Sequence, residues 1–433
     1  AAEQPYEVPE NWVWVRLGAI AEIVTGGTPS KKHPEYYGGN FPFYKPSDLD
    51  QGRLTYDASE YLSEEGKKVS RIIPKNSTAV CCIGSIGKCG YLMCEGTTNQ
   101  QINSAIPKIN SLCLYYYLCT ENFAQNLLSM ASATTIAIVN KSKMESCAFP
   151  LPPLSEQQRI VECIEELFAK LDEAKERLQE VAESFAVRKA AILHKAFTGE
   201  LTKQWRLENG VSDESWEEKK GEDFFEYVTS GSRGWAKYYS DKGSIFVRMG
   251  NLNHGTIELD FSDIRYVELP NQVEGQRSKL QKNDILISIT ADVGMIGLVR
   301  EDMDAYINQH VALARPKNDL YAEFLAWYFV SDVGLQQMQN KQRGATKIGL
   351  GLQDIRSIIL KIPTLPEQHE IVRLINNLLA RERAAKQATE QALASIDLMK
   401  KSILARAFCG ELGTNKASEA SALELLRQVL AEN

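Results

Sequence analysis

The sequence is poor in the residues that usually build active sites and metal centres. It holds five histidines and nine cysteines in 433 residues, and no cysteine pair has C-x-x-C spacing. One cluster, at Cys81, Cys82, Cys89 and Cys94, has zinc as an alternative, but no histidine lies near it in sequence, so we predict no metal site. The odd cysteine count indicates reduced thiols, and hence a cytoplasmic protein.

Membrane spans and catalytic motifs are also missing. No apolar run approaches the roughly 20 residues of a membrane-spanning helix, and no secretion signal is visible. The segment Gly84–Lys88 resembles a phosphate-binding loop, but its spacing is wrong, and Cys89 stands where serine or threonine should bind magnesium. The Asn/Asp-Pro-Pro-Tyr/Phe motif of amino-methyltransferases is absent as well. The sequence therefore predicts a protein that binds other molecules and has no catalytic motif of its own.

What the chain does contain is a long internal repeat. Residues 152–201 align without a gap on residues 363–412, at a constant shift of 211 positions, and 20 of the 50 aligned pairs are identical. A period this long excludes a solenoid of short repeats. The chain is therefore a duplicated two-part unit, in which each globular module is followed by one copy of the shared segment.

The shared segment has the pattern of a coiled-coil helix, with apolar residues alternately four and three positions apart. In the first copy these residues are Ile160, Ile164, Leu167, Leu171, Ala174, Leu178, Val181 and Phe185. The second copy keeps the register at Ile371, Ile375, Leu378, Ala385, Ala392, Ile396, Met399 and Ile403, with Glu382 and Thr389 as weak members. Each copy begins after prolines with Glu-Gln and ends at a glycine, Gly199 or Gly410. At 1.5 Å per residue, each helix would be roughly 65 Å long.

The two apolar stripes share one phase, so we expect the helices to face each other. The first helix leads from module one to module two, and an antiparallel return would pair the stripes and bring the tail back beside module one. We therefore predict two antiparallel coiled-coil helices with pseudo-two-fold symmetry. The alternative is two amphipathic helices that are each buried in an ordinary domain.

The modules themselves resemble each other weakly and have a mixed α/β pattern, because β-branched runs alternate with glycine turns. Matched segments are Phe43–Leu49 with Phe246–Leu252 and Asn99–Gln101 with Asn308–His310. The expected fold class is α+β. The expected parts are a module at 1–150, a helix at 151–201, a module at 202–362, a helix at 363–412, and a tail with a short helix at 413–433.

Charge gives no support to a simple nucleic-acid binder. The net charge is −7, with 13 basic against 14 acidic residues in 1–150 and 19 against 23 in 205–362. A DNA-binding domain is usually basic. Positive patches must therefore arise from folding, or a partner must supply most phosphate contacts.

At the repeated segments the chain resembles the specificity subunits of type I restriction–modification enzymes. The resemblance rests on the helix starts PLPPLSEQQRIV and IPTLPEQHEIV and the helix ends KAFTGEL and RAFCGEL, and it covers almost the whole chain. It implies that each module is a target recognition domain for one half of a bipartite double-stranded DNA site. It also implies that the helices set the gap between the half-sites and dock two modification (methyltransferase) subunits.

The resemblance further implies that the chain is no enzyme and holds no cofactor. S-adenosylmethionine would be bound by the modification subunits, and ATP with magnesium by two restriction subunits where these complete a nuclease. Two alternatives stay open. One is a non-DNA coiled-coil scaffold whose modules bind protein or RNA, and the other is a DNA-processing enzyme with unrecognised catalytic residues.

Candidate DNA-binding residues come from polar loops, because phosphates need small polar or basic donors and base edges need Arg, Asn, Gln, Ser or Thr. They are Thr28, Ser30, Lys31, Lys32, Lys45 and Ser47 in module one, and Ser232, Arg233, Trp235, Lys237, Arg248, Gln342, Arg343, Thr346 and Lys347 in module two. An exposed Trp235 ring would pack on a sugar or base, and a loop anchor is the equal alternative. Asn99 and Asn308 recur in both modules, so we expect them to be structural or to contact the DNA backbone.

Overall fold

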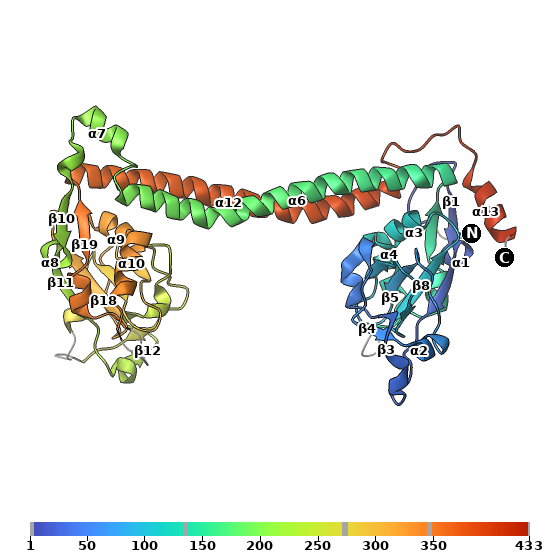
Figure 1. Ribbon diagram of the computed structural model, residues 1–433, viewed down its shortest axis with the longest axis horizontal. Helices are drawn as coiled ribbons and strands as arrows, with labels where there is room; N and C mark the ends of the chain where they lie inside the picture. The colour runs from blue at the N-terminus through green and yellow to red at the C-terminus, as the bar shows by residue number, and fades with distance from the viewer. Residues whose placement is uncertain (1–3, 133–136, 271–275, 344–348, 432–433) are drawn as a thin grey trace. The chain divides into compact units, whose positions relative to one another are not determined.

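The computed structural model describes residues 4–132, 137–270, 276–343 and 349–431. The chain forms two compact units. Unit 1 holds the first module with the chain up to Gln179 and from Gln391 onward, and unit 2 holds Glu180–Glu390. Each unit combines one α/β module with a stretch of each long helix (Figure 1).

A four-stranded antiparallel sheet forms the centre of the module in unit 1. Its order is β2-β8-β5-β6, from β2 (Ala21–Thr25), β8 (Ile102–Pro107), β5 (Thr78–Cys81) and β6 (Cys89–Tyr91). A smaller sheet has the order β4-β3-β7, from β4 (Glu60–Leu62), β3 (Tyr37–Tyr44) and β7 (Thr97–Thr98). A separate pair joins β1 (Val13–Arg16) to β9 (Ala148–Leu151), which leads into the long helix.

The module in unit 2 repeats this topology. Its central sheet has the order β11-β18-β15-β16, from β11 (Phe225–Ser230), β18 (Val311–Pro316), β15 (Ile285–Ser288) and β16 (Ile296–Leu298). The second sheet has the order β12-β14-β13-β17, from β12 (Tyr239–Ser240), β14 (Tyr266–Val267), β13 (Ser244–Val247) and β17 (Ala305–Ile307). Here β10 (Glu217–Lys220) pairs with β19 (Ile359–Ile362). The α+β class and the duplication are thus confirmed.

One helix of each module, α3 (Ser111–Leu118) or α9 (Ala322–Val330), lies between the central sheet and the long helices (Figure 1). Both are apolar on nearly every face because both sides are covered. The Asn110 side chain caps α3 by accepting from the backbone N–H groups of Leu112 and Cys113. The remaining short helices are α1 (Leu17–Ile20), α2 (Glu64–Lys68), α4 (Glu121–Ser129), α5 (Lys141–Glu145), α7 (Lys203–Asn209), α8 (Gly221–Phe224), α10 (Asp332–Asn340), α11 (Leu352–Arg356) and α13 (Ala422–Ala431).

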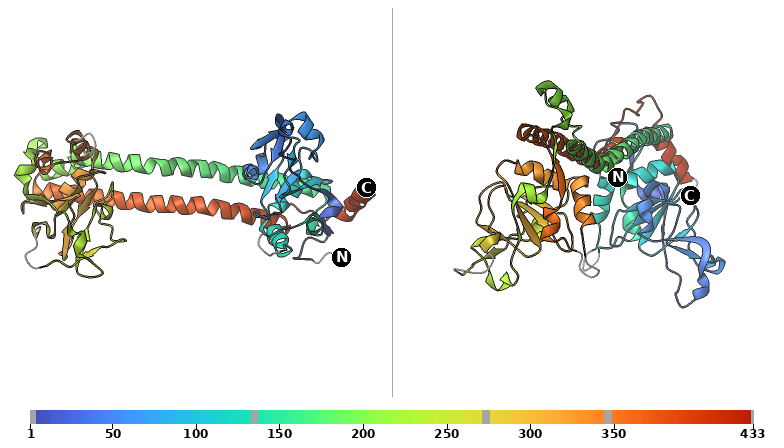
Figure 2. Two further views of the ribbon diagram at one scale, coloured as in Figure 1. Left: turned by 90° about the horizontal axis from the view of Figure 1, so that it is seen from below. Right: turned by 60° about the vertical axis from the view of Figure 1, so that its left-hand side comes forward.

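The two long helices, α6 (Leu154–Phe197) and α12 (Leu365–Ala407), lie side by side in each unit (Figures 1 and 2). In unit 1, the Asp172 carboxylate of α6 lies 2.5 Å from Nζ of Lys400 on α12. In unit 2, Arg188 lies 2.8 Å from Glu382. Along α6 the paired residue rises from 172 to 188, whereas its partner on α12 falls from 400 to 382. The two helices therefore run antiparallel, as predicted.

The predicted apolar seam is only partly right. Ile160, Ile164 and Ile396 are buried, but Val181, Ala385 and Met399 are exposed. Val181 and Ala385 lie in the middle of the helices and belong to neither module core. Ile160 and Ile164 lie at the start of α6, which packs into the core of a module. Thr389, a weak seam member by sequence, is buried. Helix ends in the cores are Ile160, Val161, Ile164, Leu404, Ala407 and Phe408 in unit 1, and Leu193, Ala196, Phe197, Ile371, Val372, Ile375 and Leu379 in unit 2.

The repeated Glu-Gln at each helix start ties the helix to its module. The Gln157 amide donates to Pro152 O at 2.9 Å, and its oxygen accepts from the Asn110 backbone N–H at 3.1 Å. Gln368 makes the matching bonds to Pro363 O and from the Tyr321 N–H. Both glutamines are buried, and a buried amide needs hydrogen-bond partners. This need explains why both copies of the repeat contain the Glu-Gln motif.

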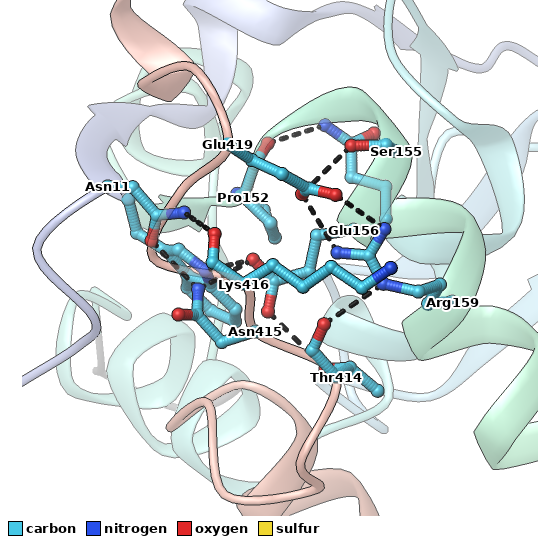
Figure 3. Close-up of polar contacts among 11 residues, drawn as sticks. Asn11, Pro152, Ser155, Glu156, Arg159, Thr414, Asn415, Lys416 and Glu419 are labelled. Carbon is cyan, nitrogen blue, oxygen red and sulfur yellow. Dashed lines mark hydrogen bonds and ion pairs between the residues drawn. The ribbon is translucent and has the colours of Figure 1, made fainter.

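The buried glutamates of the two copies have different partners. Glu156 accepts from Trp12 Nε1 at 2.7 Å and from Nδ2 of Asn415 in the tail at 2.9 Å (Figure 3). Arg159, one turn further, forms a two-pronged ion pair with Glu419, with both distances 2.8 Å. The tail after α12 is therefore bound to the start of α6, and α13 beyond it packs against α1.

In unit 2, the segment after α6 takes the place of the tail. Glu367 accepts from Thr202 Oγ1 and from Nη1 of Arg206, both at 2.7 Å. Arg206 also donates to Gly199 O and to Asp213. Each module is thus closed by the segment that follows the long helix ending beside it.

Candidate nucleic-acid interface

In module one, the loops that hold the candidate residues leave one edge of the sheets. β2 ends at Thr25 opposite Asn103 at the start of β8, and β3 ends at Tyr44 beside Thr98. The turn between β7 and β8 begins at Asn99, whose N–H donates to Tyr44 O at 3.1 Å. The loops 26–33 and 45–47 therefore flank this turn on both sides.

Module two brings the matching loops together around its own turn. Ser232 forms a parallel bridge with Asn308, and the Asn308 N–H donates to Val247 O at 3.1 Å. The Ile289 N–H donates to His310 O at 3.0 Å. Arg343 bridges Gly349, which also bridges Thr290 next to Ile289. Segments separated by more than 100 residues thus meet at one edge.

A glycine at the end of the first strand makes this convergence possible in both modules. A Cβ atom on Gly26 would lie 2.1 Å from Asn99 O, and one on Gly231 would lie 1.9 Å from Ile307 O. Neither position has room for a side chain, because the loop backbone lies directly against the turn.

The recurring asparagines hold the turns, as expected for structural residues. The Asn99 side chain accepts from the Gln101 N–H at 3.0 Å, and the Asn308 side chain accepts from the His310 N–H at 3.1 Å. The residues that follow in these turns, Gln100 and His310, are further candidates that the sequence analysis did not name. Gln100 and His310 are exposed beside the candidate loops, and Gln100 accepts from Thr28 Oγ1 at 2.5 Å. The only signal in the sequence was their place next to a repeated asparagine.

The predicted residues of module one are accessible. Thr28, Ser30 and Ser47 are exposed, as are the two lysines of the loop after β2. Lys31 and Lys32 form no ion pair with any described residue. Lys45 differs, because it is half-buried and lies 2.8 Å from Glu60. Lys31 and Lys32 are therefore unneutralised cations at this edge, where Arg71, which donates to Thr25 O, also has no ion pair among the described residues.

Module two also presents two candidate cations, Arg233 and Lys237, that pair with no described carboxylate. Arg233 and Lys237 are exposed, and Lys237 lies over the Tyr238 ring. Arg248 is paired with Asp263 at 2.8 Å. Arg343 reaches Asp354 at 3.0 Å, yet its side chain remains 83% exposed. Ser232 and Gln342 are half-buried, whereas Thr346 and Lys347 lie outside the described residues.

Of the two alternatives for Trp235, a contact with a nucleotide or an anchor of the loop, the burial of the ring favours the anchor. The ring is 4% exposed and packs between Phe246 and Tyr306, with ring centroids 5.7 and 5.4 Å away. Burial of this ring anchors the loop that carries Arg233 and Lys237. The ring therefore positions the basic residues and does not reach a nucleotide.

The thiols of the cysteine cluster donate hydrogen bonds to backbone carbonyls or are buried. Cys81 donates to Ile83 O and Cys89 to Leu118 O. Burial raises the pKa of the Cys82 thiol to about 12, so it stays protonated at neutral pH. Within the described ranges, no three His, Cys, Asp or Glu side chains group as metal ligands, and no helix has the length and apolarity to cross a membrane.

Comparison with known families decides the class of the chain. Residues 9–183 and 213–393 each match the family described as type I restriction modification DNA specificity domain. The chain belongs to this family. The two matches coincide with the two modules and their adjoining helices, so a non-DNA scaffold is not favoured.

Relatives of this family align with nearly the whole chain. The specificity subunit of the type I restriction enzyme EcoBI of Escherichia coli is 28% identical over 98% of this chain and 93% of its own length. The EcoKI specificity subunit of Escherichia coli strain K12 is 25% identical over 98% of this chain and 96% of its own.

Solved structures show the same fold. The HsdS subunit from Thermoanaerobacter tengcongensis superposes with a TM-score of 0.67 at 18% identity, over 94% of this chain and 99% of its own. A chain from a study of complex assembly and conformational transition of the type I R-M system gives a TM-score of 0.68 at 18% identity, over 94% of this chain and all of that chain.

Proposed function

We propose that this chain is the DNA sequence-specificity subunit of a type I restriction–modification complex, and that each module reads one half of a bipartite site. The observation that carries the proposal is the duplicated edge, where exposed polar and basic side chains surround the Asn99 turn in one module and the Asn308 turn in the other. Two diverged copies of one edge suit two half-sites of different sequence.

The side chains of these edges divide into two chemical roles. Lys31, Lys32 and Arg233 lack carboxylate partners among the described residues, so they are available to phosphates. Gln100 and Arg343 carry the amide and guanidinium groups that bind base edges in the major groove. Lys31 and Lys32 would position the module on the DNA backbone, and the nearby Gln100 amide would then contact a base edge.

The partners we propose are modification subunits that dock on the long helices. Val187 on α6 and Leu398 on α12 occupy equivalent positions, since 211 residues separate them, and they are 70% and 66% exposed. Because equivalent positions of both helices carry an exposed apolar side chain, each is a candidate contact for one modification subunit. S-adenosylmethionine, and ATP with magnesium where restriction subunits join, would be bound by these partners.

The test is genome-wide mapping of methylated adenines in a host with and without this chain. The expected result is a split motif that disappears on deletion and returns on complementation. The purified chain alone should neither bind S-adenosylmethionine nor methylate DNA. Methyl transfer by the chain alone would contradict the division of labour, and a continuous or unchanged motif would contradict the assignment.

A further inference from the structure

A cavity of about 350 Å³ lies within unit 2, where both long helices meet the module. Its apolar wall is formed by Phe185, Trp327 and Leu379, each less than a tenth exposed. Its polar lining includes the cations Lys189, Arg383 and Lys386. The cavity lies against the helices and is separate from the loops around the Asn308 turn.

The two acidic residues of the cavity are already neutralised. Glu258 lies 2.6 Å from Arg300, and Glu382 lies 2.8 Å from Arg188. The Lys189 ammonium, by contrast, makes no hydrogen bond or ion pair with any described residue. Burial, followed by the charges of Arg383 and Lys386, lowers the pKa of Lys189. Lys386 lies 3.9 Å from Glu390, so Lys189 and Arg383 are the lining cations that pair with no described carboxylate.

The equivalent place in unit 1 is balanced by carboxylates. There Lys400, which corresponds to Lys189 at a shift of 211, lies 2.5 Å from Asp172. Glu165 accepts from Arg53 at 2.6 Å and from the Tyr116 hydroxyl at 3.1 Å. The cation is thus retained in both units, and in unit 1 it has its own acid.

Unit 2 has lost both of these acids. The position of Asp172 is taken by Arg383, and that of Glu165 by Asn376. The position of Tyr116 is taken by Trp327, whose buried indole N–H has no partner among the described residues. The loss of Glu165 is matched by the loss of its partner Arg53, because Thr256 takes the place of Arg53 beside Gly255. The change from Asp172 to Arg383 and the unpartnered Trp327 donor remain, and both indicate a missing anion beside Lys189.

We propose that this cavity binds a small organic anion, whose carboxylate or phosphate pairs with Lys189 and Arg383 while its apolar part contacts Phe185 and Leu379. The anion replaces the carboxylates that unit 1 supplies from its own helices. Arginine and lysine together suit either group, and the apolar wall favours an organic body over a bare inorganic ion.

The experiment measures binding to the purified full-length chain by calorimetry, with benzoate, adenosine monophosphate and inorganic phosphate as probes. At least one organic probe should bind saturably and more tightly than inorganic phosphate, and the comparison of the two organic probes separates carboxylate from phosphate. Lys189→Gln should weaken that binding about tenfold or more, as expected for one lost charge-assisted contact.

Arg383→Asp provides the sharper variant because it restores the residue type that unit 1 has at this position. It should abolish anion binding and raise the thermal midpoint of the unliganded chain, since the new carboxylate faces Lys189 as Asp172 faces Lys400. The matched control is Lys195→Gln, which removes a charge from α6 outside the cavity, where Lys195 lies 3.8 Å from Glu200. It should change neither quantity.

Three results would overturn the proposal. The first is that no organic probe binds saturably. The second is that wild type and Arg383→Asp bind the probes equally, which indicates non-specific attraction. The third is that Arg383→Asp reduces association with a modification subunit while no probe binds, which makes the cavity a protein contact.

Discussion

At the scale of single residues, the two buried glutamates at the helix starts show how one motif serves two surroundings. Glu156 binds the neutral donors Trp12 and Asn415, whereas Glu367 binds the cation Arg206. The Arg206 side chain is 7% exposed, so its charge depends on the carboxylate. Without Glu367, the buried guanidinium keeps only the exposed Asp213 carboxylate, 2.9 Å away, so its charge is less well compensated.

Glu367→Gln should therefore lower the free energy of unfolding by about 1.5–3 kcal/mol, the range for a hydrogen bond to a charged group, because Asp213 still pairs with Arg206. Urea unfolding measures this change, and hydrogen exchange should place the loss in α7 and the start of α12. Glu166→Gln is the control, because Glu166 pairs with Lys170 on the exposed surface of α6, and it should leave stability nearly unchanged. Equal effects of the two variants would show that the burial of the pair has no energetic role.

The adjacent residues Asn99 and Gln100 should separate structure from recognition. Asn99→Ala removes the bond that closes the turn and should cost about 1 kcal/mol of stability. Gln100→Ala should leave stability unchanged and relax one half of the methylated motif, since this exposed amide lies at the candidate edge. Urea unfolding and methylome mapping of both variants check the pair. An intact motif in a stable Gln100→Ala complex would exclude base readout by this amide.

Sequence alone could place the loops but not the state of each side chain. The candidate loops follow strand ends, and strand ends that share an edge bring their loops together. Whether a side chain in such a loop is free depends on partners far away in the chain. Trp235 is covered by Phe246 and Tyr306, and Arg248 is neutralised by Asp263, and neither contact leaves a signal in local sequence.

At the scale of elements, the long helices explain where the heptad pattern held and where it failed. A 3,4 spacing predicts which residues share a face, and Ile164 and Ile375 are buried accordingly. It does not predict which neighbour covers that face. The ends pack into module cores, so Met399 is exposed although it occupies a seam position.

Partner docking should depend on the exposed apolar face of these helices. Val187→Asp or Leu398→Asp should weaken association with the modification subunit about tenfold or more, because a buried aliphatic side chain contributes about 1.5–3 kcal/mol. Each change should affect one of two binding events, which native mass spectrometry resolves. Leu207→Asp is the matched control, since Leu207 is 69% exposed on α7. An equal loss with the control would remove the helix face as the docking site.

The bound tail should respond to pH through Glu419. Hydrogen bonds from Arg159 lower the pKa of this carboxyl below its ordinary value of 4.5. A depressed folded pKa means that the contact stabilises above the ordinary pKa and is lost as the pH falls through the folded value. Hydrogen exchange of residues 413–421, corrected for intrinsic rates, should thus be slow at pH 7 and become faster only once the pH has fallen below the ordinary pKa of 4.5.

Glu419→Gln provides the check on that pH dependence. It should give fast exchange of the same segment at pH 7, with little further change on acidification, because no titrating carboxylate remains opposite Arg159. A tail that stays protected in this variant would show that α13 and its contact with α1 hold the segment without the ion pair.

At the scale of the whole molecule, the chain consists of two modules that each have their own apolar core and are connected by the long helices. The largest apolar clusters belong to different units, one built around α9 and the other around α3. Duplication of this plan followed directly from the repeat in the sequence. The sequence also predicted a tail beside module one, but not its bonds, because the Glu156–Asn415 bond joins residues 259 positions apart.

Separate cores predict that the modules can be exchanged one at a time. Replacing residues 1–150 with the equivalent module of a relative should change one half of the methylated motif and leave the other half unchanged. The transplanted module must keep a tryptophan at the position of Trp12, which donates to Glu156, and the backbone N–H of Asn110, which donates to Gln157. A module that lacks the tryptophan should fold poorly, because it leaves a buried carboxylate short of a donor. Methylome mapping of an exchanged, folded complex decides the matter: a change in both halves, or in neither, would mean that the two modules do not read DNA independently.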